Sequence, residues 1–377
     1  MKNKVLTGLL LVLIGGWGSL SAQSAGSNYS RQVNTLIGTK GVGLTSGYLY
    51  PGATYPYGMV QFTPSYFSKR SGFVINQLSG GGCEHMGNFP TFPVKGKLKM
   101  SPDNILNYRI NISEEKGHAG YYEAMVQEDI KAKLTVTERT GMASYEYPAD
   151  QQYGTVIIGG GISATPIEQA AIVITAPNKC EGYAEGGNFC GLRTPYKVYF
   201  VAEFDTDALE SGTWKRDELK PNTTFAEGEY SGVYFTFDVN KKKNIQYKIG
   251  VSYVSVENAR ENLKAENTGW DFLQIQNQAE SKWNHYLGKI EVEGTNPDRT
   301  TQFYTHLYRS FIHPNVCSDV NGEYMGADFR VHKSRSKHYT SFSNWDTYRT
   351  QIQLLSILDP EVVSDIVISH QLFAEEA

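Results

Sequence analysis

Between Tyr108 and Val256, one short segment after another alternates apolar with polar residues. Alternation with a period of two places the apolar side chains on one face of a β-strand, so each segment predicts a half-buried strand. Turns rather than helical patterns separate the segments. The region therefore predicts an antiparallel β-sandwich. The segments are Ala119–Val126, Ile130–Thr137, Met142–Tyr147, Lys197–Phe204, Gly232–Val239 and Gln246–Val256.

The region that precedes these strands, Gln32–Lys95, is rich in Gly, Pro and aromatic residues and has no clean periodicity. It predicts short strands, such as Met59–Phe62, separated by long loops whose glycines allow close backbone approach. Loops of this kind often carry function. The glycine run Gly80–Gly82 matches neither dinucleotide-binding nor P-loop spacing, so it predicts no phosphate site.

After Val256 the apolar residues recur at helical intervals. Gly288 is a plausible C-cap for the first helix, and a short strand is predicted to follow it. The apolar faces of the later helices point in several directions, so these helices do not make a finished core. We therefore expect the beginning of an all-helical domain that is incomplete at Ala377. The predicted segments are a helical region at Asn258–Leu287, a strand at Lys289–Glu293, and helices at Asp298–Phe311, from Ser343 onward, and at Glu361–Phe373.

The first residues read as a secretory signal. Lys2 and Lys4 precede the apolar run Val5–Ile14, and small residues end at Ala22. We therefore expect an exported protein, periplasmic or extracellular if the source is bacterial, with no membrane span. The predicted division of the chain is a signal peptide at 1–22, a β-sandwich domain at 23–257, a helical linker at 258–295 and the first helices of the next domain at 296–377.

Composition narrows the possible functions. A net charge of −4 and a pI near 6.1 exclude the basic footprint of a nucleic-acid-binding protein. Aromatic residues make up 12% of the chain, including 25 Tyr. Flat rings with polar tips suit ring-shaped polar ligands, although β-rich proteins carry many aromatic residues in any case.

The chain contains four Cys, and their spacing matches no zinc site. Cys180 and Cys190 flank a glycine-rich loop and could close it as a disulfide, which the sequence leaves open. Cys83, in the glycine run, looks unrelated to that loop.

The segment Ser343–Thr350 places an indole, a carboxylate, a phenol and a guanidinium at the start of a predicted helix. Trp345 can stack on a sugar ring, while Asp346 and Arg349 can hydrogen-bond its hydroxyls. The other interpretation is a capping box formed by Ser343 and Asp346. One oxygen of the carboxylate could also cap the helix while the other binds a sugar.

Other polar groups give weaker signals. Ser318–Glu323 faintly resembles a calcium loop but is better interpreted as a turn. Glu84 and His85 could act as an acid–base pair, although a polar loop pair is the commoner case. Glycoside hydrolysis needs two carboxyls that flank the bond, and spacing alone selects no pair from the nearby carboxylates. These carboxylates are Asp319, Glu323, Asp328 and Asp346.

Motifs from Val33 to the end of the chain, in the same order, together resemble glycoside hydrolase family 92. They are Val33–Thr39, Tyr50–Gln61, Gly81–Cys83, Phe303–Arg309 and Phe342–Arg349. The resemblance implies an N-terminal β-sandwich packed on an (α/α)6 barrel, of which this chain holds only the first helices. It also implies a calcium-dependent, inverting exo-α-mannosidase, of α-1,2-mannosidase type, acting on a mannose-containing glycan.

By motif match, the resemblance implies substrate contacts from both domains. Tyr57, Gly58 and Cys83 would approach mannose from the sandwich, and Trp345, Asp346 and Arg349 from the barrel. Family members are much longer, so the general acid, the general base and most calcium ligands are expected beyond residue 377. No catalytic residue and no metal ligand is assigned in this chain, which we expect to be inactive alone. The alternative function is a non-catalytic carbohydrate-binding sandwich. The sequence gives no signal for the preferred mannosidic linkage or for the oligomeric state.

Overall fold

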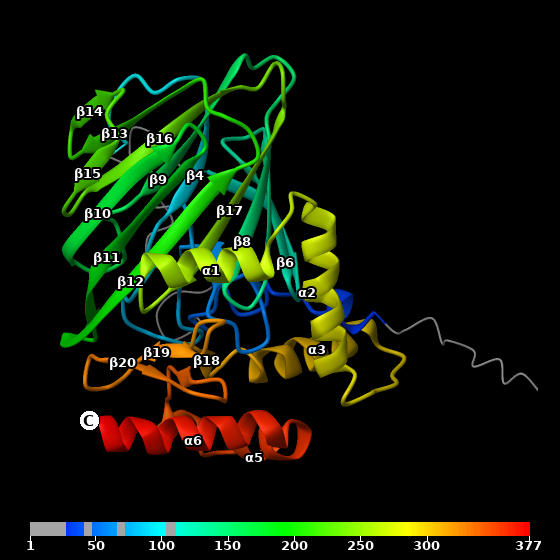
Figure 1. The fold of residues 1–377 in the computed structure, drawn as a ribbon. Helices are drawn as coiled ribbons and strands as arrows, with labels where there is room; N and C mark the ends of the chain where they lie inside the picture. Colours follow the sequence, from blue (N-terminus) through cyan, green and yellow to red (C-terminus); the bar gives the residue numbers. More distant parts are fainter. Residues whose placement is uncertain (1–27, 41–46, 66–71, 103–110) are drawn as a thin grey trace, which may run out of the picture.

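The computed structural model describes residues 28–40, 47–65, 72–102 and 111–377. The predicted signal peptide at 1–22 lies outside these residues. Two large β-sheets lie face to face, and the helices gather at one side and one end of them (Figure 1). Every strand pair is antiparallel, so the predicted antiparallel sandwich followed by helices is confirmed. No helix in the described part of the chain is long and apolar enough to span a bilayer.

The first sheet has eight strands in the described residues. In spatial order they are β1 (Ala53–Thr54), β2 (Gln61–Pro64), β3 (Phe73–Val74), β4 (Thr91–Lys95), β9 (Tyr153–Gly159), β16 (Ser231–Asp238), β13 (Glu210–Lys215) and β14 (Glu218–Pro221). The second sheet has nine. They are β15 (Phe225–Glu227), β10 (Ile167–Ala176), β11 (Lys179–Phe189), β12 (Leu192–Phe204), β17 (Asn244–Ser252), β8 (Thr140–Glu146), β7 (Ile130–Val136), β6 (Tyr121–Val126) and β5 (Ile112–His118).

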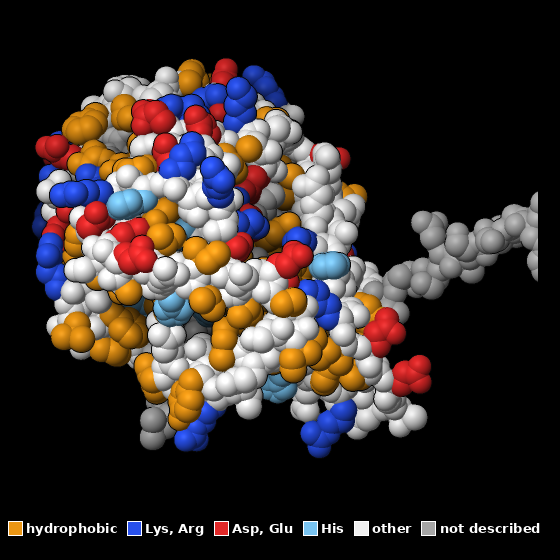
Figure 2. All heavy atoms as spheres, turned by 60° about the horizontal axis from the view of Figure 1, so that its bottom comes forward, with side chains coloured by type: hydrophobic (Ala, Val, Ile, Leu, Met, Phe, Trp, Pro, Cys, Tyr) orange, Lys and Arg blue, Asp and Glu red, His pale blue; other side chains and the backbone are white. Residues whose placement is uncertain are grey.

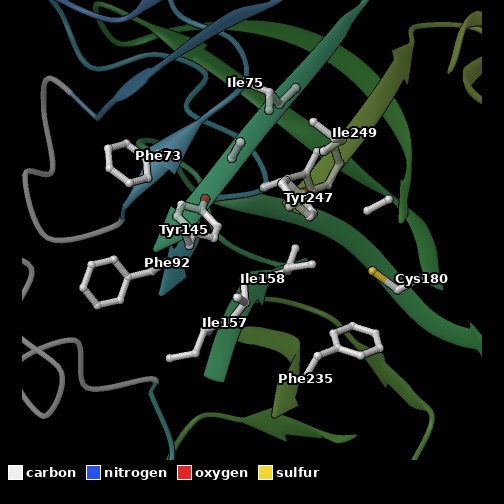
Figure 3. Close-up of a cluster of buried hydrophobic side chains, with 14 of the residues drawn as sticks. Phe73, Ile75, Phe92, Tyr145, Ile157, Ile158, Cys180, Phe235, Tyr247 and Ile249 are labelled. Atoms are coloured by element: carbon white, nitrogen blue, oxygen red, sulfur yellow. The ribbon is translucent and has the colours of Figure 1, made fainter. Parts of the chain in front are cut away.

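The main core fills the space between the two sheets. Burial alternates along β6 and β11, as a strand with one buried face requires. Aromatic and branched side chains from both sheets meet there, among them Phe73, Tyr145, Phe235, Tyr247 and Ile249 (Figure 3). Phe73 stacks on Tyr145 with a centroid distance of 6.4 Å. Because the core is close-packed, the strands are held rigidly, and the loops that connect their ends start from fixed positions.

The helices begin near the end of β17. They are α1 (Val256–Glu266), α2 (Phe272–Leu287), α3 (Pro297–Ser310), α4 (Asn344–Thr347), α5 (Gln351–Leu358) and α6 (Pro360–Glu376), with η1 (Tyr29–Gln32) near the other end of the chain. The single helical region predicted at Asn258–Leu287 is two helices. Ser255 caps α1 by accepting from Asn258 N, and Asp271 caps α2 by accepting from Gln274 N.

The predicted strand at Lys289–Glu293 does not form. The Tyr304 hydroxyl occupies its backbone groups, since it accepts from Val292 N and donates to the Ile290 carbonyl, each at 3.3 Å. Between α3 and α4 the chain instead forms two small antiparallel pairs. They are β18 (Asn315–Val316) with β21 (Tyr339–Thr340), and β19 (Glu323–Met325) with β20 (Val331–Lys333).

A second core lies between the helices and the loops of the sandwich. Trp283 of α2 is fully buried and donates its indole N–H to the Thr54 carbonyl at 2.7 Å. Its ring centroid is 4.5 Å from that of Tyr308 on α3. The Tyr308 hydroxyl in turn bonds Thr54 Oγ1 at 2.7 Å. An aromatic layer therefore joins α2 and α3 to strand β1.

A buried ion cluster ties the sandwich to helix α1. Arg139, between β7 and β8, contacts Glu266 of α1 at 2.7 Å and Glu138 at 2.6 Å, and donates Nε–H to the Ser318 carbonyl at 2.7 Å. Lys337 also pairs with Glu138. Burial alone would raise the pKa of Glu138, but Arg139 and Lys337 hold it below its usual value.

The α5–α6 end of the molecule exposes large apolar side chains. Figure 2 turns this end toward the viewer and shows hydrophobic side chains spread across it. Ile357 of α5 is 78% exposed, and Val367 and Phe373 of α6 are more than half exposed. Exposed apolar groups gathered on two neighbouring helices are typical of a face that contacts another surface.

Replacing Arg139 tests the ion cluster. Arg139→Ala leaves Glu138 and Glu266 buried without their guanidinium, so we expect a loss of about 3–5 kcal/mol in the free energy of unfolding. Urea titration followed by tryptophan fluorescence measures it. Arg193→Ala is the control, because it breaks a solvent-exposed pair with Glu168 and should leave the urea midpoint nearly unchanged. Equal effects of the two substitutions would contradict the role of the cluster.

Candidate functional site

The turn that contains α4 presents its polar side chains outward. Trp345 is 80% exposed, and Asp346 and Arg349 are exposed with it. Ser343 Oγ donates to Asp346 Oδ2 at 2.5 Å, and Arg349 Nε–H donates to the Tyr348 hydroxyl at 2.6 Å. One short segment therefore offers a free aromatic face beside a carboxylate and a guanidinium.

The capping box predicted for Ser343 and Asp346 is wrong. The Ser343 side chain makes no hydrogen bond to a backbone N–H of the helix, because its hydroxyl is directed at the Asp346 carboxylate. The Ser343 carbonyl instead accepts from Asp346 N and Thr347 N, both at 2.9 Å. Asp346 thus keeps oxygen atoms available on an exposed turn, which suits a ligand better than a cap.

Tyr57 and Gly58 lie deeper than the sequence suggested. Tyr57 is 2% exposed, and its ring meets Tyr286, Phe311 and Tyr339 edge-on at 5.8, 6.0 and 6.1 Å. Burial, with Asp359 nearby, raises the pKa of Tyr57 far above its usual value. Its hydroxyl finds no hydrogen-bond partner among the described residues. A Cβ on Gly58 would come within 2.9 Å of Tyr55 Cβ, so glycine is needed for the turn itself.

Cys83 forms a disulfide with Cys190, across 107 positions of sequence. The bridge considered between Cys180 and Cys190 is absent, because Cys180 is fully buried as a free thiol in the core of the sandwich. Cys317 is also free and buried. Burial raises the pKa of both thiols, which keeps them protonated. The disulfide fastens the loop that carries Cys83 to the β11–β12 hairpin.

The connecting segment, Ser310–Val316, brings the two sides of the candidate site together. Tyr57 N donates to the Phe311 carbonyl, and Val316 N donates to the Tyr57 carbonyl, both at 2.8 Å. The Gln351 side-chain amide, at the start of α5, donates to the Ser310 and His313 carbonyls at 3.1 and 3.2 Å. The sandwich loop and the start of α5 therefore share one support.

The glycine-run loop reaches the same segment. Ser79 N donates to His313 Nε2 at 2.8 Å. No contact between Cys83 and Trp345 is found in the described residues. The loop that carries Cys83 is linked to the connecting segment through Ser79, and the turn that carries Trp345 is followed by Gln351, which bonds the same segment. Of the six predicted sugar contacts, Tyr57 and Gly58 bond the connecting segment directly. Contact of any of the six with sugar stays a prediction.

The other carboxylates considered from the sequence are occupied. Asp319 is buried and accepts from Ser252 Oγ at 2.7 Å and from the Asn258 and Asn262 amides at 2.9 and 2.6 Å. Gly322 N donates to the Asp319 carbonyl, which confirms the predicted turn. The Asn258 amide also donates to Glu323, and Asp328 faces His332. No acid–base pair is assigned from these carboxylates.

Calcium is the one metal that the sequence suggested. No group of three or more His, Cys, Asp or Glu that could hold a metal gathers within the described ranges. No calcium ligand is assigned within these ranges.

Sequence reasoning missed three residues that hold the segments of the candidate site together, namely His313, Gln351 and Cys190. His313-Pro314 served only to end a helix in that reasoning, and Gln351 lay just past the motif. The pairing of Cys190 with Cys83 had no local signal, because each cysteine lies beside glycines in a separate loop.

Comparisons with known proteins point to one family. The model of the glycosyl hydrolase family 92 N-terminal domain matches residues 32–252, and that of the family 92 catalytic domain matches residues 258–376. An uncharacterized secreted glycosidase of Arthroderma benhamiae is 26% identical over 85% of this chain and 45% of its own length.

Solved structures agree on the fold. A family 92 α-mannosidase of Bacteroides thetaiotaomicron superposes with a TM-score of 0.82 at 25% identity, covering 93% of this chain and 50% of that one. An inverting family 92 mannosidase of the same organism gives 0.77 at 24%, with 90% and 48% covered. The chain thus spans about half the length of the proteins that it matches.

The disulfide can be tested by its thermodynamic effect. Cys190→Ser removes a crosslink over a long loop, and we expect a loss of about 2–4 kcal/mol in the free energy of unfolding under oxidising conditions. Cys83→Ser and the double variant should lose the same amount, since either change breaks the same bond. Additive losses in urea titrations of the three variants would show that the two cysteines act separately.

Proposed function

This chain belongs to glycosyl hydrolase family 92, and we propose that it supplies the sandwich side and the first barrel helices of an inverting exo-α-mannosidase. The proposed substrate is a mannose-containing glycan, with α-1,2 linkage as the first candidate. A related family 92 α-mannosidase has been solved with mannoimidazole, which supports a mannose pocket. We also propose export, in agreement with the relative described as a secreted glycosidase.

The observation that carries the proposal is the exposed turn around α4. Within the described residues, the indole of Trp345 is 80% exposed, next in sequence to a carboxylate and close to a guanidinium. Trp345 can cover the apolar face of a pyranose ring, while Asp346 accepts from its hydroxyls and Arg349 donates to them. These geometric preferences together favour a sugar over other small polar ligands.

The buried residues give the turn a fixed base. Tyr57 and Gly58 join the sandwich to the connecting segment by hydrogen bonds, and Cys83 is held by its disulfide. We propose that Tyr57 and Gly58 position the pocket. The Tyr57 hydroxyl, which has no partner among the residues that the structure describes, would offer it one polar atom. Cys83 is proposed to contact the sugar from the sandwich side through the loop that carries it.

In an inverting reaction one carboxylic acid protonates the leaving oxygen, and a second carboxylate directs water to the opposite face of the sugar. In the proposed enzyme this chain binds and orients the sugar. No general acid, general base or calcium ligand is assigned within this chain, and we expect the chain alone to release no mannose.

Asp346 is the residue to test. In an extended protein that contains this chain and hydrolyses α-1,2-mannobiose, Asp346→Ala should lower kcat/KM for that substrate about 10- to 100-fold, because a charged acceptor for a sugar hydroxyl is lost. Asp298→Ala is the matched control, since Asp298 is an exposed acid in the first turn of α3. Neither change should alter the melting temperature, because both side chains are exposed.

Three measurements distinguish the proposed enzyme from the alternative, a sandwich that binds carbohydrate without catalysis. Clear hydrolysis by the 377-residue chain alone would refute the division of labour proposed above. Mannose affinity in the isolated segment 23–260, measured by calorimetry and equal to that of the whole chain, would favour a binding sandwich without catalysis. An unchanged kcat/KM in Asp346→Ala would remove Asp346 from the sugar site.

A further inference from the structure

Two histidines hold the glycine-run loop, Leu78–His85, by accepting hydrogen bonds from neighbouring amides. Leu78 N donates to His85 Nε2 and Ser79 N donates to His313 Nε2, each at 2.8 Å. One histidine belongs to the loop, and the other comes from the connecting segment, 234 positions away in sequence. Both imidazoles are buried or nearly so.

The geometry fixes the protonation state of both rings. An imidazole nitrogen accepts a hydrogen bond only when it carries no proton. His85 Nδ1 lies 2.6 Å from the Cys83 carbonyl oxygen, which can only accept, so Nδ1 carries the proton and Nε2 is free to accept. His313 Nε2 accepts from Ser79 N in the same way. Each contact therefore requires a neutral imidazole.

His313 also holds the other side of the candidate site. Its carbonyl accepts from the Gln351 side chain, which begins α5 directly after the exposed turn. The ring of this one residue thus supports the sandwich loop, and its backbone supports the helix start. Within the loop, Gly80 N donates to the Tyr48 carbonyl at 2.9 Å, and the Cys83–Cys190 bridge fixes the far end.

We propose that His85 and His313 are positioning residues that hold the Cys83 loop in register with the Trp345 turn, and that they do so only while both rings are neutral. The proposal rests on the proposed function, which makes these two segments opposite sides of one sugar pocket. Protonation would place an N–H against the N–H of Leu78 or Ser79, so each contact would change from attraction to repulsion.

The surroundings of the two rings set the direction of the pH effect. Burial lowers the pKa of His313 to about 4, against a smaller opposing effect of Asn315, and His85 across the contact lowers it further. Burial also lowers the pKa of His85, against the opposing hydrogen bonds to Cys83 and Leu78. On its other side His85 meets the uncharged ring of Phe189, 5.8 Å away between centroids, and Gln351 of α5 is uncharged as well.

Because both pKa values are lower in the folded protein, the unfolded chain binds more protons in mild acid. The stabilisation from the neutral rings is fully present above the unfolded pKa of about 6.5. It is lost progressively as the pH falls from there through the folded pKa values. The loop should therefore loosen on acidification while the rest of the sandwich stays folded.

Residue-resolved hydrogen exchange of the 377-residue chain tests the proposal without any sugar. After correction for intrinsic rates, Ser79 N–H protection in the natural sequence should fall as the pH is lowered from 7 to 4. His313→Phe keeps the volume but removes the acceptor, so we expect roughly tenfold faster exchange at Ser79. His313→Gln offers an uncharged acceptor and should restore protection while reducing its pH dependence to the part that His85 contributes.

His306→Phe, at an exposed histidine on α3, is the matched control and should leave Ser79 unchanged. The proposal is overturned if Ser79 exchanges equally fast in the natural sequence and His313→Phe, or if its protection does not vary with pH. Should His313→Phe fail to fold, the pH series and His313→Gln still decide the question.

Kinetics of the extended protein separate this proposal from the proposed function. A positioning role predicts that His313→Phe raises KM for α-1,2-mannobiose more than it lowers kcat, and that His313→Gln shifts the acid limb of the kcat/KM profile. Expected exchange results without any hydrolysis would reject the mannosidase and keep the loop support. Hydrolysis with unchanged hydrogen exchange and an unchanged acid limb of the kcat/KM profile would reject the loop support and keep the mannosidase.

Discussion

The placement of the helices against the sandwich depends on one buried guanidinium. Arg139 leaves the β7–β8 turn, pairs with Glu266 at the end of α1, and donates to the Ser318 carbonyl in the loop after α3. Its burial makes these partners obligatory, because an unpaired charge there is strongly destabilising. Three parts of the chain, far apart in sequence, must therefore meet at one point and in one orientation.

A second set of directional contacts restricts the same junction. The buried carboxylate of Asp319 accepts from Ser252 at the end of β17 and from Asn258 and Asn262 along α1. Apolar packing alone tolerates changes of detail in how two elements fit. Amide-to-carboxylate bonds with defined geometry tolerate less, so α1 acts as a spacer whose polar face selects one angle between sandwich and helices.

The sequence predicted what local patterns encode. Alternation located β6, β7, β8, β16 and β17 to within a few residues, and helical periodicity located α3 and α6. It did not reveal β10, β11 or β13. The Gly-containing segment Lys179–Phe189 resembles a loop locally and becomes a strand because β10 and β12 pair with it on both sides.

Features of the site that depend on distant partners could not be read in this way. The bridge between Cys83 and Cys190 follows from how the sheets bring two loops together. The motif containing Tyr57 marked an important position, but the motif could not show that the ring is buried among Tyr286, Phe311 and Tyr339. His313 carried no motif signal, since both of its contacts come from long-range packing.

The contrast between Tyr57 and Trp345 explains why the motifs fall where they do. Recognition of a sugar needs exposed polar and aromatic groups, yet these groups must already be ordered when the ligand arrives. Here the exposed turn is followed directly by Gln351, which bonds the connecting segment, and that segment bonds the buried backbone of Tyr57. The groups proposed to bind the sugar are thereby fixed through buried ones. A family's motifs can therefore include residues that hold a site in place as well as residues that contact the ligand. Burial of a motif residue is consistent with the first of these roles.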